Sequence, residues 1–373
     1  MRGITNRSTT RRVRAALSAS VAACALAAVL PAAASAQPAA GAGPASGLTA
    51  GVERISVAPD GTQADGNSGG ASITPDGLHV VFSSSATNLT PDAPSAGDKV
   101  YLRDQQAGQT KRVGYLTPLQ PPAVSGDGEY VAYALQWMRN VRIRLDEVTT
   151  GRTASANCSA YSCNQPSLNA DGRYIALTVL INQPGLSRQR IEVQDMKTGA
   201  IQTIANLGHT LPSRPSISGD GRYVAYQDGQ TQDVFVRDHI GGTIAGPVEG
   251  PSTAASLVQL SDDGNKVVYL SGSDTYVHDM ASGTAQLVPN VRGVAIDPTG
   301  RYLLSATHGT SGPSLTLRDL QTGTDEIVSD QPASAGPDAV SAGGRDVVFQ
   351  SAADDIVPGD TNGKSDVFVR HFS

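Results

Sequence analysis

The segment Asp360-Thr-Asn362-Gly363-Lys-Ser-Asp366 has the residue types and the spacing that calcium binding uses. Its carboxylate and amide oxygens stand two and six positions apart around a glycine, and such oxygens can wrap a hard cation. The segment lacks the glutamate that closes an EF-hand loop, and an aligned segment between residues 93 and 99 keeps almost none of these ligands. Asp360, Asn362 and Asp366 are therefore candidate calcium ligands, with an ordinary Asx/Gly turn as the alternative.

Two cysteines stand close together in Cys158-Ser-Ala-Tyr-Ser-Cys163. A zinc site would need two further ligands nearby, and the surrounding sequence offers none. In an oxidising compartment, such a pair forms a local disulfide that staples a loop. We therefore predict a disulfide between Cys158 and Cys163.

Residues for catalysis are harder to find. The sequence has no His-Glu-x-x-His zinc motif, and its six histidines are scattered along the chain. Two of them, His209 and His308, fall in predicted loops, where sequence alone does not show whether they meet. Trp137 is the only tryptophan, and it offers either a stacking platform for a ligand or a packing residue. These observations favour a protein without catalytic activity.

The first 36 residues form a predicted secretory signal peptide. A stretch with five arginines precedes an apolar run from Ala15 to Leu30, and Ala34-Ser35-Ala36 provides a cleavage site. The run ends at a proline, too early for a membrane span, and no later stretch is long and apolar enough for one. The residues up to Cys24 resemble a lipoprotein cleavage motif, in which Cys24 would carry the lipid. The apolar run continues beyond Cys24, which favours cleavage after Ala36 over lipidation. We expect a protein that is secreted or periplasmic, in the cell envelope.

Cleavage would leave a strongly acidic chain. The signal holds five of the 28 basic residues and none of the 34 acidic ones, so the remainder carries 23 basic and 34 acidic residues, a net charge of −11. Such a surface repels the phosphates of nucleic acids and anionic lipids. We therefore expect no nucleic-acid partner.

A sevenfold repeat dominates the rest of the chain. Each copy has a small polar residue, then Asp-Gly or a variant, then alternating aromatic and β-branched residues, as in Ser-Gly-Asp127-Gly128-Glu-Tyr-Val-Ala-Tyr133. Asp-Gly permits a tight hairpin, and the alternation predicts strands. The turn glycines are 51, 44, 49, 43, 36 and 44 residues apart, close to the length of a four-stranded propeller blade. The repeat therefore predicts an all-β fold, a seven-bladed β-propeller, in which the repeated Asp and Gly residues are structural. The turn glycines are Gly77, Gly128, Gly172, Gly221, Gly264, Gly300 and Gly344.

The ring needs a closing strand. The chain ends in blade 7 before an outer strand can follow, whereas Val52–Val57 reads as a strand without a blade. We predict that this N-terminal strand pairs beside Val367–Phe372 and closes the propeller, which removes two open sheet edges. The propeller would then span residues 52–373. Residues 37–51, rich in Ala, Gly and Pro, would be a flexible leader.

The repeated segments resemble a known family. Ser-x-Asp-Gly-x-Tyr-Val-Ala-Tyr, followed by strands such as Asp233-Val-Phe-Val-Arg-Asp238, is similar to the WD-like repeats of TolB-type β-propellers over about residues 52–373. The resemblance implies the propeller fold and a periplasmic, partner-binding protein without catalytic activity. No separate N-terminal α/β domain precedes the blades here, so the family's role in envelope complexes is not carried over.

Three long, Gly-rich loops are predicted to meet where blade 7 closes on blade 1. They are Ala58–Gly70, Ser84–Gly97 and Ser351–Ser365, and long loops on a rigid scaffold are where binding residues concentrate. We therefore predict a monomeric, non-catalytic binding or scaffold protein that contacts a protein or a glycan through its loop-rich face. The alternative is a propeller-fold polysaccharide lyase or glycosidase, with acidic or histidine residues at the mouth of the central channel.

Overall fold

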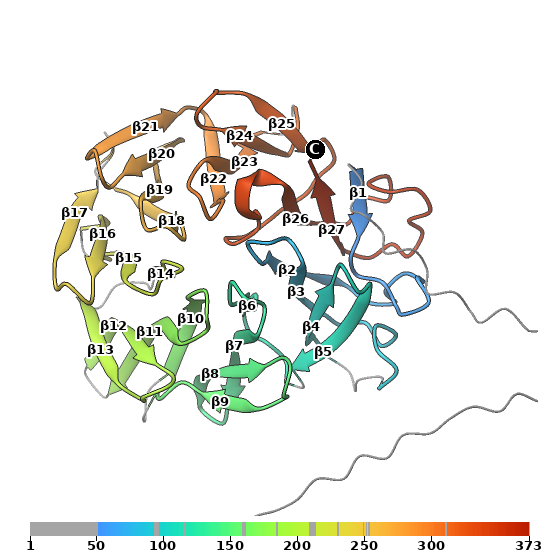
Figure 1. Cartoon of the computed structure of the whole chain (residues 1–373), viewed down its shortest axis with the longest axis horizontal. Coiled ribbons are helices and arrows are strands. Elements are labelled where there is room, and N and C mark those ends of the chain that lie inside the picture. The colour runs from blue at the N-terminus through green and yellow to red at the C-terminus, as the bar shows by residue number, and fades with distance from the viewer. Residues whose placement is uncertain are drawn as a thin grey trace, which may run out of the picture. The chain divides into compact units, whose positions relative to one another are not determined.

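The chain forms a ring of seven antiparallel sheets around a central axis (Figure 1). The computed structural model describes residues 51–372 except 93–96, 115, 159–161, 184–185, 209–213, 230, 249, 251, 253 and 310–311. The predicted seven-bladed β-propeller is confirmed. The predicted signal peptide, Cys24, His209 and all but the last residue of the leader lie outside the described residues.

The first three blades each have four strands, in chain order from the axis outward, as predicted. Blade 1 consists of β2 (Ser68–Ile73), β3 (His79–Ser84), β4 (Lys99–Asp104) and β5 (Gln109–Gly114); blade 2 of β6 (Ala123–Val124), β7 (Tyr130–Trp137), β8 (Asn140–Glu147) and β9 (Thr153–Ser155); blade 3 of β10 (Ser162–Leu168), β11 (Tyr174–Gln183), β12 (Leu186–Asp195) and β13 (Ile201–Gly208).

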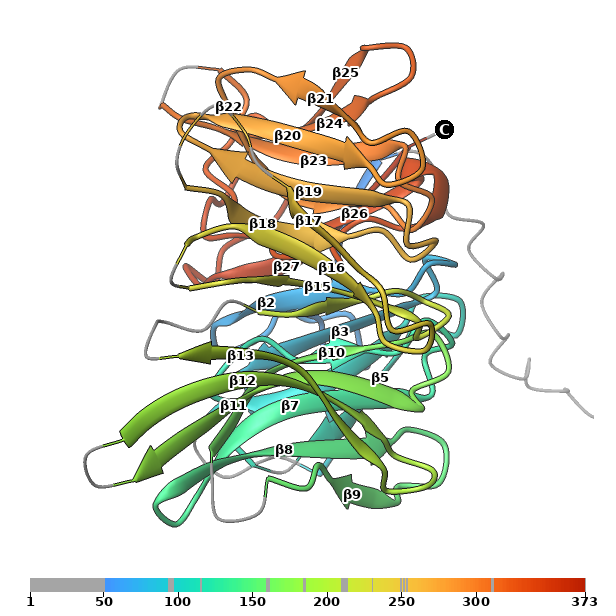
Figure 2. The ribbon, with the colours of Figure 1, turned by 90° about the vertical axis from the view of Figure 1, so that its left-hand side faces the viewer.

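Blades 4 to 6 repeat the same plan, and in the side view they follow one another from β15–β17 at mid-height to β22–β25 at the top (Figure 2). Blade 4 consists of β14 (Ser216–Ile217), β15 (Tyr223–Gln227), β16 (Val234–Asp238) and β17 (Ile244–Val248); blade 5 of β18 (Ser256–Leu260), β19 (Lys266–Ser271), β20 (Asp274–Asp279) and β21 (Thr284–Val288); blade 6 of β22 (Val291–Ile296), β23 (Tyr302–Thr307), β24 (Leu315–Asp319) and β25 (Asp325–Ser329).

Blade 7 is closed by the N-terminal strand. Its sheet has the order β1 (Gly51–Arg54), β27 (Asp366–His371) and β26 (Asp346–Ser351), so segments from the two ends of the described chain lie side by side (Figure 1). Val52 stands opposite Arg370, which confirms the predicted closure. The strand ends at Arg54 rather than at Val57, because the chain turns back after the N–H of Ile55 has bonded to the carbonyl of Val367 (2.8 Å).

The innermost strand predicted for blade 7 is not formed. Two isolated bridges, Val340 with Val347 and Ser334 with Gln350, stand in its place, followed by a short 3₁₀ turn, η1 (Ala342–Gly344). In the segment before this turn, the backbone is not extended at Asp338, whose φ is +61°. That departure places Asp338 near the central axis, as described below.

The turn glycines interlock neighbouring blades. Each of the seven has φ between 65° and 77°, and each is covered by the side chain two residues after the turn glycine of the preceding blade, at the place where a Cβ atom would have to go. A glycine is required here both for the left-handed backbone and for the close approach. The covering residues are His79 on Gly128, Tyr130 on Gly172, Tyr174 on Gly221, Tyr223 on Gly264, Lys266 on Gly300, Tyr302 on Gly344 and, across the closure, Asp346 on Gly77.

The repeated aspartates are structural, as predicted. In the first turn of a blade, Asp220 accepts the backbone N–H of Arg222 at 2.9 Å. In the second turn, Asp238 accepts two backbone N–H groups and pairs with the guanidinium of Arg222 at 2.7 Å. The hydrogen bond from Arg222 lowers the pKa of Asp238 to about 2. These carboxylates are therefore held within the turns.

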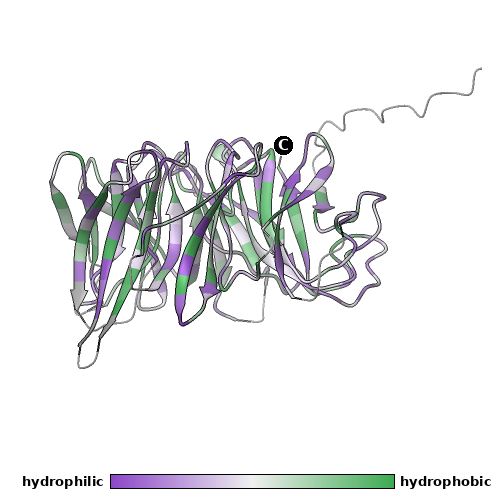
Figure 3. Cartoon of the chain, turned by 90° about the horizontal axis from the view of Figure 1, so that it is seen from below, coloured by the Kyte–Doolittle hydropathy of each residue, from purple (hydrophilic) through white to green (hydrophobic). Residues whose placement is uncertain are grey.

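Hydrophobic and hydrophilic residues alternate in bands along the strands (Figure 3), and buried apolar residues of adjacent blades pack into clusters. The cluster at the closure joins Ile55, from the N-terminal segment, to Phe349 and Phe368 of blade 7, and all three are at most 1% exposed. Leu89 and Ile356, from the two long loops, pack into the same cluster. No helix in the described part of the chain is long and apolar enough to cross a membrane.

Candidate binding cavity and groove

The three long loops meet at the junction of blades 7 and 1, as predicted. The Asn362 amide donates to the carbonyl of Ala64 (3.1 Å), and the N–H of Ser365 bonds to the side-chain oxygen of Asn67 (3.0 Å). The loop Ser84–Gly97 joins the other two through Thr87, whose N–H donates to the carboxylate of Asp65 in the loop Ala58–Gly70 (2.6 Å). Residues 93–96 of the loop Ser84–Gly97 lie outside the described residues. The convergence fixes one rim of the loop-rich face.

The candidate calcium ligands come together around a cation of the protein itself. The guanidinium of Arg54 lies 3.0 Å from Asp360 and 3.8 Å from Asp366, and all three side chains are at most 9% exposed. Asp366 also accepts hydrogen bonds from Ser56 (2.5 Å) and from the Asn362 amide (2.8 Å), while burial raises its pKa. In the described chain, no three acidic, histidine or cysteine side chains are grouped to hold a metal. A calcium ion here would need the side-chain oxygen of Asn362 as a ligand besides the carboxylates of Asp360 and Asp366, and the calcium site stays a prediction.

Cys158 and Cys163 form a disulfide, with their Cα atoms 5.8 Å apart. Both cysteines are buried beside Ile175 and Leu177 in the core between blades 2 and 3. The bond staples the connection from the outer strand β9 to the inner strand β10, and therefore supports the loop-rich face near the central axis.

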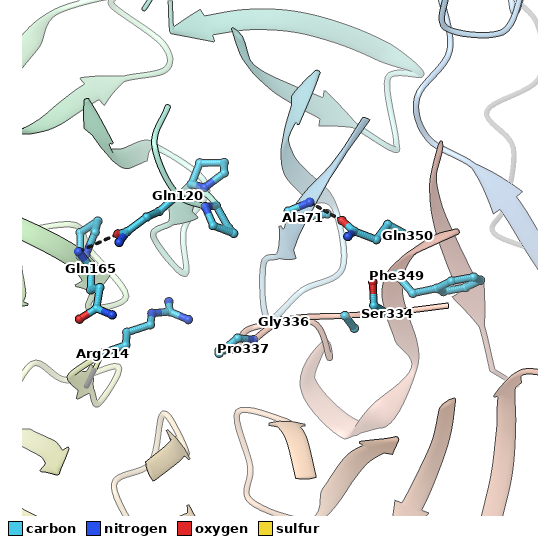
Figure 4. A pocket seen from close by; sticks show the side chains of 14 residues that line it. Ala71, Gln120, Gln165, Arg214, Ser334, Gly336, Pro337, Phe349 and Gln350 are labelled. Carbon is cyan, nitrogen blue, oxygen red and sulfur yellow. Dashed lines mark hydrogen bonds between the residues drawn. The ribbon is translucent and has the colours of Figure 1, made fainter. Parts of the chain in front are cut away.

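A cavity of about 370 Å³ opens on the loop-rich face at the centre of the ring (Figure 4). Its walls come from residues just before or within the innermost strands, and from the end of β26. Because these segments start the inner strands, the cavity lies at the end of the channel opposite to the Asp-Gly turns. The lining residues are Gly70, Ala71, Gln120, Pro121, Pro122, Gln165, Pro166, Arg214, Ser334, Ala335, Gly336, Pro337, Phe349 and Gln350.

A groove of about 580 Å³ continues from this cavity toward the closure rim. It shares Gly70, Gln120, Pro121 and Gln350 with the cavity, so the two hollows form one path. Blades 2, 1 and 7 all line its outer part. Blade 2 contributes the segment that precedes β6, blade 1 contributes Asn67 and Asp98, and blade 7 contributes residues 352, 363 and 365. The predicted sector therefore borders a continuous depression that runs from rim to axis.

Two glutamines present amide donors to this path. The side-chain oxygen of Gln350 accepts the N–H of Gly70 at 2.5 Å, and that of Gln120 accepts the N–H of Gln165 at 3.0 Å. A backbone N–H can only donate, so the oxygen of each amide is fixed and its NH₂ group must point the other way. Among the described residues, neither NH₂ group has an acceptor. Both are half-buried and ready to bond to a ligand.

Arg214 is the only charged side chain among the described residues that line the cavity. It comes from the segment just before β14 and extends into the space between Gln165 and Pro337 (Figure 4). Its Nη2 lies 2.6 Å from a carboxylate oxygen of Asp338, and its side chain is 28% exposed. The other oxygen of Asp338 accepts a hydrogen bond from the amide of Gln259 (2.8 Å). Asp338 therefore ties blade 7 to blades 4 and 5 at the axis.

Below this tie the channel narrows to a cavity of only about 40 Å³. Asp262 and Asp338 both line it. Burial, and then the nearby charges of Asp338, Asp263 and Asp297, raise the pKa of Asp262 to about 7. This lower cavity is too small for a sugar ring or a peptide, so the upper cavity and the groove are the candidate site.

Of the residues considered for catalysis or ligand stacking, His308 and Trp137 do not line the site, and His209 lies outside the described residues. His308 of blade 6 bonds to the carbonyl of Ser273 of blade 5 (2.7 Å), and no described histidine lines either hollow. Trp137 ends β7 and is 54% exposed, outside the described lining. Ser68 stands in a Gly-x-Ser-x-Gly sequence, but it is 3% exposed and its hydroxyl lies 2.8 Å from that of Ser84. It is a structural serine.

Sequence reasoning missed the cavity residues themselves. One signal was present: a Gln-Pro pair stands just before the inner strand of blade 2, at Gln120-Pro121, and within the inner strand of blade 3, at Gln165-Pro166. A Gln-Pro pair at this position places a proline ring and an amide at the axis. Arg214 and Gln350 carry no such repeated signal, because each occurs at a different place in its blade.

Solved structures of the same fold are known. An oligogalacturonate lyase in complex with manganese is 14% identical, with a TM-score of 0.63, over 88% of this chain and 94% of that one. An oligogalacturonate lyase from Vibrio parahaemolyticus is 12% identical, with a TM-score of 0.63, over 87% and 98%. TolB from Acinetobacter baumannii is 17% identical over 70% and 62%, with a TM-score of 0.47. At these identities the lyases share the propeller fold with this chain and nothing more is established.

No family model matches the sequence. No curated protein matches it either. Membership of the TolB-type family therefore stays an expectation from the repeated motif.

Proposed function

We propose that this protein is an exported, non-catalytic glycan-binding propeller, which holds an oligosaccharide in the groove and central cavity of its loop-rich face. The observation that carries the proposal is the continuity of the two hollows through Gly70, Gln120, Pro121 and Gln350. Together they make a path from the rim to the axis, of a size that suits a short oligomer. A flat surface for a protein partner would not need such a path.

The chemistry of the walls supports a sugar ligand. The lining combines amides, serine hydroxyls, glycines and proline rings, and Arg214 and Asp98 are its only charged members among the described residues. Oriented amide groups suit sugar hydroxyls, which both donate and accept hydrogen bonds. The rigid prolines keep the path open without a ligand, which reduces the entropy lost on binding.

The same lining supports binding without turnover. Glycosidases need two carboxyl groups that flank the scissile bond. Among the described residues that line the cavity and the groove, Asp98 of the groove is the one carboxylate, and there is no histidine. Asp262 and Asp338 belong to the narrow lower cavity instead. That this fold also occurs in proteins named for an oligogalacturonate substrate is compatible with a sugar ligand.

Calorimetric titration of the chain from residue 37 onward against a panel of oligosaccharides tests the proposal. Gly336 lines the cavity with an unstrained backbone, and no atom lies within 4 Å of the place where its Cβ would stand. Gly336→Trp should therefore fill the cavity without disturbing the fold, and should abolish binding. The control Ala285→Trp, on the exposed outer strand β21, should bind like the wild type.

Two results would overturn the proposal. One is binding of a protein partner, sensitive to Gly336→Trp, with no oligosaccharide bound at all. The other is the release of new reducing ends from a bound oligosaccharide, which would make the protein a lyase or glycosidase.

A further inference from the structure

We infer that the central cavity is a subsite for an acidic sugar, in which Arg214 binds the carboxylate of a hexuronate residue. The inference rests on the proposed oligosaccharide function and names the chemical class of its ligand. The first observation is that the charge of the cavity lining is opposite in sign to the net charge of the chain. In a chain whose predicted mature form carries −11, the described lining of the central cavity contains one charged side chain, and that side chain is a cation.

Most N–H groups of the Arg214 guanidinium are available to a ligand. Arginine carries five N–H groups in a planar fork. Only Nη2 is engaged, with Asp338, and no described residue accepts a hydrogen bond from Nε or Nη1. The side chain is 28% exposed, and it faces the open cavity (Figure 4). A planar fork of this kind matches the two oxygens of a carboxylate.

Asp338 positions Arg214 without closing the subsite. Its second oxygen is taken by the Gln259 amide at 2.8 Å, its carbonyl accepts the N–H of Ile73 at 2.8 Å, and its φ of +61° fixes the backbone in place. It lines the lower cavity and is not among the residues that line the upper one. The arginine is therefore held in place before the ligand arrives, and its free edge points to the ligand's side.

The neighbouring groups are donors as well. The NH₂ groups of Gln120 and Gln350 are fixed by backbone donors on their oxygens, as described above. A ligand that satisfies one guanidinium and two amide NH₂ groups must be rich in acceptors. A hexuronate supplies the carboxylate for Arg214, and its ring and hydroxyl oxygens can accept from the amides. A neutral hexose would leave the guanidinium without its best partner.

The test compares acidic sugars with their neutral counterparts. The probes are trisaccharides of glucuronate, galacturonate and mannuronate, each beside its carboxyl-reduced form, titrated calorimetrically into the chain from residue 37 onward. We expect at least one acidic trisaccharide to bind at least about tenfold more tightly than its reduced form, because only the acidic form can accept a charge-assisted hydrogen bond from Arg214 through a carboxylate. Arg214→Gln should remove that preference and leave binding of the reduced form within about twofold. Arg214→Lys, which keeps the charge and loses the fork, should fall between.

A matched control exists on the outer strands of blade 6. Arg318 pairs with Asp325 at 2.6 Å, with side-chain exposures of 27% and 45%, close to the 28% and 34% of Arg214 and Asp338. Arg318→Gln should therefore reproduce the loss of an ion pair without touching the cavity, and should bind both sugars like the wild type. If Arg214→Gln unfolds because Asp338 is left unpaired, the double variant Arg214→Gln/Asp338→Asn removes both charges and takes its place.

The two proposals fail in different ways. Equal binding of acidic and reduced trisaccharides, both blocked by Gly336→Trp, overturns the acidic-sugar subsite and leaves the oligosaccharide function standing. An acidic preference that survives Arg214→Gln also overturns it. Binding of peptides through a C-terminal carboxylate, lost in Arg214→Gln, with no sugar bound, overturns both.

Discussion

The carboxylate of Asp346, in blade 7, lies against Gly77, the turn glycine of blade 1. Tyrosine takes the same position at four other blade junctions, so the closure uses the repeated contact with a different side chain. Asp346 is itself held by the Ser341 hydroxyl at 2.9 Å, and it lies 2.8 Å from Nδ1 of His371. The ring is therefore closed twice, by this contact near the axis and by β1 on β27 at the outer edge.

Gly77→Ala should weaken the closure. The new Cβ would meet the Asp346 carboxylate, and the backbone at φ +77° disfavours any side chain, so we expect a loss of about 2–4 kcal/mol in the free energy of unfolding. Gly323→Ala is the matched control, since its φ is +75° and no atom lies within 4 Å of the place where its Cβ would stand. It should cost about 1 kcal/mol. Urea unfolding measures both, and equal losses would show that the Asp346 contact contributes nothing.

Much of this fold follows from local chemistry in the sequence. The Asp-Gly turns set φ, the alternating residues after them set the strands, and their sevenfold recurrence sets the number of blades. The closure follows from an unpaired strand at each end of the repeat. The missing inner strand of blade 7 does not follow, because Val340 and Ser341 read like their counterparts in the other blades. There the positive φ of Asp338 and its contacts across the axis override the local pattern.

The disulfide should contribute modestly to stability. Cys158 and Cys163 close a short loop, for which the lost entropy of the unfolded chain is worth about 2 kcal/mol. Cys158→Ala/Cys163→Ala should therefore unfold at a lower urea concentration than the oxidised wild type. Dithiothreitol should lower the midpoint of the wild type and leave that of the variant unchanged. If reduction, confirmed by mass, leaves the wild-type midpoint where it was, the bond does not stabilise the fold.

The candidate site was predictable to the level of a sector only. Loop lengths and ring closure place three loops together, and their hydrogen bonds through Asn67 and Asn362 follow that plan. The binding groups depend on something else: Gln120, Arg214 and Gln350 come from blades 2, 4 and 7 and meet only because the ring brings their strands to one axis. Such a meeting depends on the tilt and register of separate sheets, which no local pattern encodes.

The predicted calcium site gives a test with three proteins. If Asp360, Asn362 and Asp366 hold calcium, about 1 mM calcium should raise the melting temperature of the wild type, since a ligand that binds only the native state stabilises it. Asp360→Asn should abolish the rise. Arg54→Gln, which removes the guanidinium now lying between the two carboxylates, should enlarge it. A melting temperature unaffected by calcium in all three proteins would rule the site out.

Asp262 should make the protein less stable as the pH rises. Its pKa is about 7 in the folded chain and about 4 when unfolded, so between these values the native state binds more protons than the unfolded state. Stability therefore falls across this window; the cost of ionising Asp262 is absent below about pH 4 and fully present above about pH 7.

Asp262→Asn removes that ionisation and nearly preserves the volume of the side chain. We therefore expect the variant to melt at a higher temperature than the wild type at pH 8, and the difference to shrink at pH 5, where the wild-type carboxyl is protonated. Thermal unfolding at the two pH values measures this. Asp354→Asn, at an exposed position in the long loop of blade 7, is the control and should show no such dependence. A gain for Asp262→Asn that is the same at both pH values would mean that packing, and not the charge of Asp262 near Asp338, sets the cost.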